Sequence, residues 1–182
     1  GTIFSGRHAH AGPVSSFFDA YAATAPSLAT ELRTAGYRTA YFGKWHCGIV
    51  RDQVPASIRN APPERVRGSR HRTPEWHRAG FEDWCAFESL NRHFEVSVYR
   101  NEATEPEWLE GYETDALTDE VIRYLEAYDR EQPLFLVLSV TPPHFPLIVP
   151  DEWKRHDPEA LEVRPNFVNH PEPPGAGNIP GG

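Results

Sequence analysis

The sequence contains no methionine, only two cysteines and only two lysines, and it has no long apolar run. The two cysteines, Cys47 and Cys85, are too few to define a disulfide framework, so they leave the redox compartment open. A transmembrane helix needs about 18 consecutive apolar residues, and the absence of such a run excludes one. The net charge of −8 argues against a general nucleic-acid-binding protein, whose surface would be basic.

Proline, by contrast, is abundant. The 18 prolines are roughly twice the average share, which predicts long irregular connections. The chain begins with Gly1 rather than methionine, and residues 165–182 are expected to form only loop. The length would allow one domain with its own core. We nevertheless expect residues 1–182 to be most of one lobe of a larger domain, cut at both ends.

Positive charge gathers in one segment. Between Arg51 and Arg78, seven arginines stand against three acidic residues. The segment is rich in proline and shows no periodicity, so residues 51–79 are predicted to be a solvated surface insertion. In the alternative interpretation, the arginines form a rim that attracts anionic substrates.

Two stretches of the chain predict a helix followed by a strand. In the first, Ser27 can cap a helix, Gly36 suits its left-handed stop, and residues 37–42 have the composition of a strand. In the second, the Thr114 hydroxyl is expected to cap a helix, and residues 134–140 form an apolar run typical of a strand buried on both faces of a parallel sheet. Elsewhere we expect a strand at 94–99, an acidic loop at 102–111 and a short turn or helix at 151–154. These units predict an α/β fold in which the strands share one sheet.

Titratable residues follow both predicted strands. Lys44 and His46 come directly after the first strand, and His144 follows the second. Open α/β sheets bind ligands at the carboxyl ends of their strands. A cation and an imidazole two residues apart suit binding an oxyanion and handling a proton. Taken alone, each residue is more often a solvated lysine or an ordinary loop histidine. His8 and His10 are close enough for a metal pair, but no third ligand has suitable spacing.

Several motifs, in the right order, resemble the sulfatases, the formylglycine-dependent family within the alkaline phosphatase superfamily. Residues 43–48 are similar to the GKWHLG motif of that family, with Cys47 in place of the usual leucine. Weaker similarities are those of 2–7 to LLTGR, 27–39 to TLAELLKEAGYRT, 80–82 to GFD, 114–119 to the helix before the buried strand, and 143–150 to the PHxPxxxP loop. The resemblance implies an alkaline phosphatase-like sandwich with a mostly parallel central sheet flanked by helices. Residues 1–182 would then be part of the catalytic N-terminal domain.

The resemblance also implies what lies outside the chain. Family members use a Cys-x-Pro/Ala-x-Arg motif, whose cysteine becomes formylglycine, and this motif would end just before Gly1. The ligands of the calcium ion would lie upstream of Gly1 and beyond Gly182, so no metal ligand is expected within these residues. Cys47 and Cys85 do not match the nucleophile motif. Family members are often periplasmic, secreted or lysosomal, which the sequence itself does not reveal.

The same resemblance gives the three strand-end residues their expected roles. Lys44 and His144 would bind the sulfate, and Lys44, His46 and His144 would all be catalytic. The expected substrate is a small-molecule or oligosaccharide sulfate ester, such as a sulfated carbohydrate or an aryl sulfate. Two alternatives stay open: a phosphonate or phosphate-ester hydrolase of the same superfamily, or a pseudoenzyme that binds anions without turnover. The isolated chain is expected to be inactive, and its oligomeric state is open.

Overall fold

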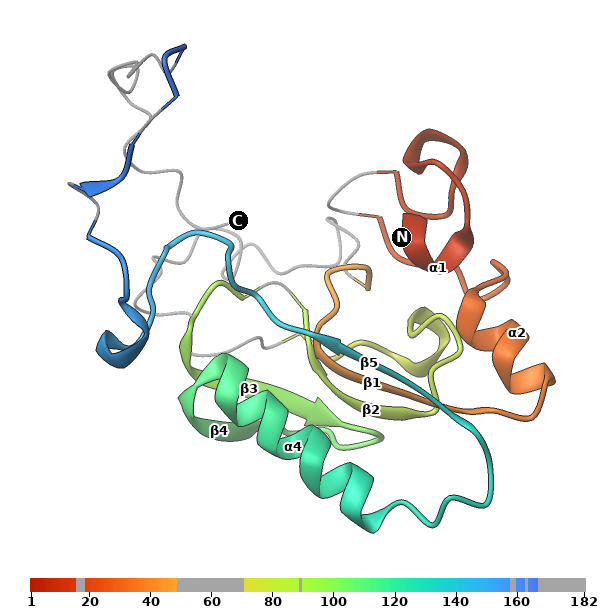
Figure 1. Cartoon of the computed structure of the whole chain (residues 1–182). Helices are drawn as coiled ribbons and strands as arrows, with labels where there is room; N and C mark the ends of the chain where they lie inside the picture. The colour runs from red at the N-terminus through yellow and green to blue at the C-terminus, as the bar shows by residue number, and fades with distance from the viewer. Residues whose placement is uncertain (16–18, 49–70, 89, 158–159, 163, 167–182) are drawn as a thin grey trace.

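The computed structural model describes residues 1–15, 19–48, 71–88, 90–157, 160–162 and 164–166. Its centre is a five-stranded sheet in the order β4-β3-β2-β1-β5 (Figure 1). The strands are β1 (Arg38–Lys44), β2 (Asp83–Phe87), β3 (Phe94–Arg100), β4 (Glu107–Tyr112) and β5 (Leu134–Ser139). β1 pairs in parallel with β2 and with β5, whereas β3 and β4 extend the sheet in an antiparallel sense. The predicted α/β class is confirmed, with a parallel centre and an antiparallel side.

Helices cover both faces of this sheet (Figure 1). They are α1 (Thr2–Ser5), α2 (Leu28–Thr34) and α4 (Glu113–Ala127), with short 3-10 turns η1 (Ala9–Ala11), η4 (Glu75–His77) and η5 (Asp151–Trp153). Side chains alternate between the faces of a strand, and β1 shows this directly. Ala40 and Phe42 pack with Leu117 of α4, whereas Tyr41 packs with Ala29 of α2 in a second, aromatic-rich core. The sheet is therefore the middle of three layers.

The capping predicted for α2 is confirmed. The Ser27 hydroxyl accepts the backbone N–H of Thr30 at 3.1 Å, and the Ser27 N–H donates back to the Thr30 hydroxyl at 2.9 Å. Two orphan donors of the first turn are satisfied in this reciprocal arrangement. Gly36 has φ 88°, the left-handed conformation expected just after the helix. The chain can thus turn sharply from α2 into β1.

The predicted start of the second helix is wrong by a residue or two. α4 begins at Glu113, after Tyr112 at the cap position, and no side chain caps it. β4 runs straight into the helix, and the Glu113 N–H donates to the His93 carbonyl at 2.8 Å. Thr114 is consequently inside the first turn, and its hydroxyl is not the cap.

Two strands were not expected from the sequence. β4 lies where a loop was predicted at 102–111, because this edge strand buries only Leu109 and leaves its glutamates in solvent. β2 was hidden within an aromatic-rich stretch that lacks alternation. The third difference concerns β5, whose residues are half-buried, or exposed in the case of Leu138, rather than buried on both faces, because β5 lies at the edge of the described sheet.

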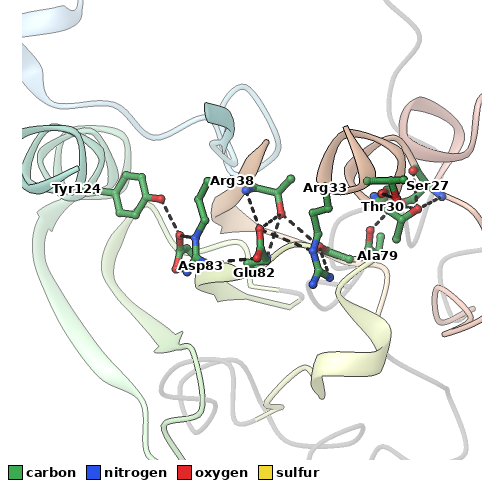
Figure 2. A network of polar contacts seen from close by, with 11 residues as sticks. Ser27, Thr30, Arg33, Arg38, Ala79, Glu82, Asp83 and Tyr124 are labelled. Carbon is green, nitrogen blue, oxygen red and sulfur yellow. Dashed lines mark hydrogen bonds and ion pairs between the residues drawn. The ribbon is translucent and has the colours of Figure 1, made fainter. Parts of the chain in front are cut away.

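Polar contacts tie the amino-terminal ends of β1 and β2 to α2 and α4 (Figure 2). Arg38 donates to both Asp83 carboxylate oxygens, at 2.6 and 2.5 Å, and Tyr124 of α4 donates to the same carboxylate at 2.7 Å. Arg33 of α2 approaches Glu82 at 3.7 Å. We call the group Arg33, Arg38, Glu82, Asp83 and Tyr124 the basal network. It lies at the amino-terminal ends of β1 and β2. Lys44 and the loop with His144 lie at the opposite, carboxyl ends of β1 and β5.

Candidate active site

The carboxyl end of β1 is held against β5 by a glycine. Gly43 pairs with Ser139 and has φ 100°, and a Cβ at this position would collide with the Ser139 carbonyl. Only glycine can combine this backbone conformation with so close an approach. Trp45 is buried in the core, and its backbone N–H donates to the Phe87 carbonyl at 2.8 Å. The backbone of Lys44, the last residue of β1, is therefore held in a fixed position.

Lys44 is half-buried, and its ammonium donates to the Asn91 side-chain oxygen at 2.6 Å. Burial lowers the pKa of Lys44 because it penalises the charged amine, whereas the negative charge of Glu113 raises it. The hydroxyl of Tyr41 donates to the Lys44 carbonyl at 2.5 Å. Side chain and backbone of Lys44 are thus both anchored.

His46 stands in a strained conformation beside Lys44. Its φ of 51° is uncommon for a residue other than glycine, and such conformations persist where the surrounding structure fixes them. Burial, then the positive charges of Lys44 and His144, lower the pKa of His46 to about 4. At neutral pH the imidazole is therefore uncharged and able to accept a proton.

His144 lies in the loop after β5 and is exposed to solvent. Its N–H donates to the Thr141 carbonyl at 3.0 Å, and its Nδ1 lies 2.7 Å from the Phe145 carbonyl oxygen. Because its charge acts on His46, the structure brings Lys44, His46 and His144 within electrostatic reach of one another. Their catalytic roles remain predictions.

Three polar residues at this end of the sheet were not anticipated. They are Asn91, which contacts Lys44, and the fully buried glutamates Glu88 and Glu113. Glu88 accepts from the Thr73 hydroxyl and from the Gly48 N–H at 3.3 Å, and burial raises its pKa to about 7. Glu88 follows β2 just as Lys44 ends β1, so the strand-end rule would have found it if β2 had been recognised.

The remaining candidates lie apart from this cluster. His8 and His10 stack with ring centroids 5.7 Å apart, and the described part of the chain brings together no group of three or more side chains that could hold a metal. Most of the predicted insertion at 51–79 lies outside the described residues. At its described end, Arg78 is buried and donates to the Asn101 carbonyl at 2.7 Å. No helix among the described residues is long and apolar enough to cross a membrane.

Comparison with known proteins identifies the family of this chain. The family model described as Sulfatase matches residues 2–166, and the chain therefore belongs to the sulfatase family. It is 30% identical over 142 residues to the ulvan-active sulfatase of Formosa agariphila. The aligned region covers 76% of this chain and 24% of the relative. It is 28% identical over 130 residues to the arylsulfatase of Klebsiella aerogenes, covering 70% of this chain and 26% of the relative. The chain thus spans about a quarter of the length of these relatives.

Solved structures share the fold. A Bacteroides fragilis protein assigned to the sulfatases superposes with a TM-score of 0.69 at 21% identity, covering 87% of this chain and 37% of the other. A second, solved with its substrate D-glucosamine-2-N,6-O-disulfate, has a TM-score of 0.56 at 20% identity, covering 79% of this chain and 24% of the other. These neighbours confirm an alkaline phosphatase-like α/β architecture.

Proposed function

We propose that the full-length protein hydrolyses sulfate esters and that this chain supplies three groups of its active site. The observation that supports the proposal is the placement of Lys44 and His46 at the carboxyl end of β1 and of His144 in the loop after β5, which pairs in parallel with β1, together with the lowered pKa of His46. Family membership supports the reaction class. The names of the relatives point to sulfated carbohydrates or aryl sulfates as substrates.

Each group has a distinct task in this proposal. The Lys44 ammonium binds a sulfate oxygen and stabilises the negative charge that develops in the transition state. Neutral His46 accepts a proton from the nucleophile's hydroxyl group. His144, exposed on its loop, contacts the bridging oxygen and protonates the departing alcohol. A positioned proton-transfer group contributes about 10²- to 10⁴-fold to the rate.

Calcium and formylglycine, which the resemblance implies, would be supplied from outside this chain. The described residues bring together no set of three or more metal-binding side chains, so they do not fit a calcium site by themselves. Cys47 is buried and burial raises the pKa of its thiol, which does not suit it to act as a nucleophile. The chemistry of this chain therefore rests on its ammonium and imidazoles.

The test replaces each lysine of the chain in the full-length protein. Lys44→Ala should lower kcat/KM for nitrophenyl sulfate by about 10²-fold or more, because the half-buried cation is lost, with little change in Tm. Lys154→Ala is the matched control, because Lys154 is an exposed lysine paired with Asp151, and it should retain full activity.

Three outcomes would contradict the proposal. Normal activity of Lys44→Ala per folded molecule would show that Lys44 is not part of the active site. Turnover of nitrophenyl phosphate without turnover of the sulfate would make the protein a phosphoesterase. Binding of sulfate without turnover of either ester would make it a pseudoenzyme.

A further inference from the structure

Glu113 is a fully buried carboxylate that the proposed chemistry does not use. Glutamate is almost never fully buried without partners, because burying a charge is costly. One oxygen, Oε1, accepts the backbone N–H of Thr141 at 2.7 Å. The other, Oε2, is buried and has no hydrogen-bond partner among the described residues. The carboxylate is therefore anchored on one side only.

The anchor lies at the start of the loop that carries His144. Thr141 comes two residues after β5 ends, and its carbonyl accepts the N–H of His144 at 3.0 Å. The Glu113 carboxylate thus binds Thr141, the residue whose carbonyl accepts the backbone hydrogen bond of His144. The Glu113 backbone is itself fixed, since its N–H donates to the His93 carbonyl at 2.8 Å.

The same end of α4 faces Lys44. Leu117, four residues after Glu113, lies so close to β1 that a Cβ on Gly43 would be 3.3 Å from its Cδ1 atom. Residues four apart share one face of a helix, so Glu113 faces the sheet just where Lys44 follows Gly43. The two charges act on each other: burial raises the pKa of Glu113 and Lys44 opposes this, while Glu113 opposes the lowering of the Lys44 pKa by burial.

Other titratable groups surround this pair. His46 follows Lys44 on the same strand end, and the His144 charge reaches the cluster through its effect on His46. His93, before β3, is buried and its ring packs against Tyr112 at 6.4 Å between centroids. Among the described groups that act on Lys44, Glu113 is the one that supplies negative charge.

We propose that Glu113 is a positioning residue that couples the ammonium of Lys44 to the loop carrying His144. The proposal rests on the function proposed for that site. Through Oε1 the carboxylate fixes the loop, and through its charge it favours the protonated form of the half-buried amine. The two halves of the sulfate-binding cluster are thereby held by one side chain that does not touch the substrate.

The experiment compares Glu113→Gln, Glu113→Ala and Glu120→Gln in the full-length protein. Glutamine keeps an oxygen for Thr141 but removes the charge, whereas alanine removes both. Glu120→Gln is the matched control, because Glu120 is a buried carboxylate of the same helix that pairs with Arg100 at 2.6 Å, within a different cluster. Acetylation of Lys44 by acetic anhydride is followed against pH, with the peptide containing Lys44 quantified by mass spectrometry.

Loss of the negative charge favours the neutral amine, so Lys44 should lose its proton at lower pH in both Glu113 variants. At a fixed pH below the wild-type midpoint, Lys44 should then be labelled faster than in the wild type, and Glu120→Gln should match the wild type. Glu113→Ala should also lower kcat/KM by about 10- to 100-fold, because the loop loses its anchor.

Identical Lys44 labelling in the wild type and Glu113→Gln would overturn the inference, whatever the activity. If the wild type cleaves no sulfate ester, the proposed function fails while the labelling still decides the role of Glu113. If Glu113→Ala does not fold, the isosteric glutamine variant alone decides it.

Discussion

His46 is the residue on which backbone, burial and charge act together. Its positive φ fixes the direction in which the side chain leaves the backbone, and burial, followed by the charges of Lys44 and His144, lowers the pKa of the imidazole. A histidine with a pKa of about 4 in the folded state and about 6.5 when unfolded binds fewer protons in the native protein between these values. The protonation state of His46 is therefore tied to the stability of the fold.

The linked prediction concerns acid. Since the folded-state pKa of His46 is depressed, its contribution to stability is present above about pH 6.5 and is lost as pH falls toward 4. After allowance for partial solvent screening, the loss should be about 1–2 kcal/mol. His46→Asn removes the titration while tolerating positive φ. Urea unfolding of the full-length protein at pH 7 and pH 4.5 should show a smaller loss of stability for the variant than for the wild type.

Glu88 titrates in the opposite direction but does not disturb this comparison. Because the pKa of Glu88 is raised, its contribution to the stability of the protein is lost as pH rises toward about 7. Glu88 is present in both the wild type and the variant, so this effect cancels in the comparison. Equal losses of stability in acid for wild type and His46→Asn would show that the charge on His46 is not coupled to folding.

The sequence predicted part of this cluster and missed part. Lys44, His46 and His144 could be named because they follow recognisable strands and match a family motif. Glu88 and Glu113 could not, because a buried carboxylate looks like any surface glutamate until its neighbours in space are known. Asn91 contacts Lys44 across 47 positions of sequence, and no local pattern encodes that contact.

At the scale of elements, the parallel pairing of β1 with β5 depends on Gly43. The Ser139 carbonyl occupies the space that a side chain would need, and φ is 100°. Gly36 offers the matched case, because its φ is 88° but nothing lies within 4 Å of its added Cβ. Comparing substitutions at the two glycines separates the energetic cost of a positive φ from the cost of a steric collision.

Gly43→Ala should lower the free energy of unfolding by more than about 3 kcal/mol, because backbone strain and a collision with backbone add together. Gly36→Ala should cost only about 1–2 kcal/mol, from conformation alone. Chemical denaturation of both variants measures the difference. Similar losses for the two would mean that β1 and β5 can separate at this point without penalty.

The elements that the sequence predicted are those with local signals. α2 has its cap and its glycine stop, and the apolar run of β5 needs no tertiary context to be recognised. β4 was missed because an edge strand with one buried residue resembles an acidic loop. Strand propensity largely reflects packing against neighbours, so a strand like β4 becomes visible only once its partner is known.

At the scale of the molecule, the basal network and the site lie at opposite ends of the same strands. Burial alone would raise the pKa of Asp83, yet hydrogen bonds from Arg38 and Tyr124 outweigh burial and lower it. This carboxylate therefore joins β1, β2 and α4 at one point (Figure 2). The network stabilises the packing of the helices on the sheet and lies away from the proposed site residues.

Arg38→Ala should accordingly lower the free energy of unfolding by about 1–2 kcal/mol, because it leaves a partly buried carboxylate without its cation. Arg33→Ala is the control: its pair with Glu82 is longer and more exposed, so the cost should stay below about 1 kcal/mol. Urea midpoints give the stability and kcat/KM gives the activity. A fall in activity per folded molecule for Arg38→Ala would show that the two ends of the sheet communicate.

The pairing of Gly43 with Ser139 also fixes the spacing between the two segments that carry the proposed site residues. Neighbouring strands are about 4.8 Å apart whatever their side chains, so the starting points of these two segments keep a constant separation. Replacing a side chain can change what lines the space between these segments but not the spacing of the strands. Adaptation to a bulkier alcohol would then have to come from the reach and composition of the segment 141–150, with the strands beneath it unchanged.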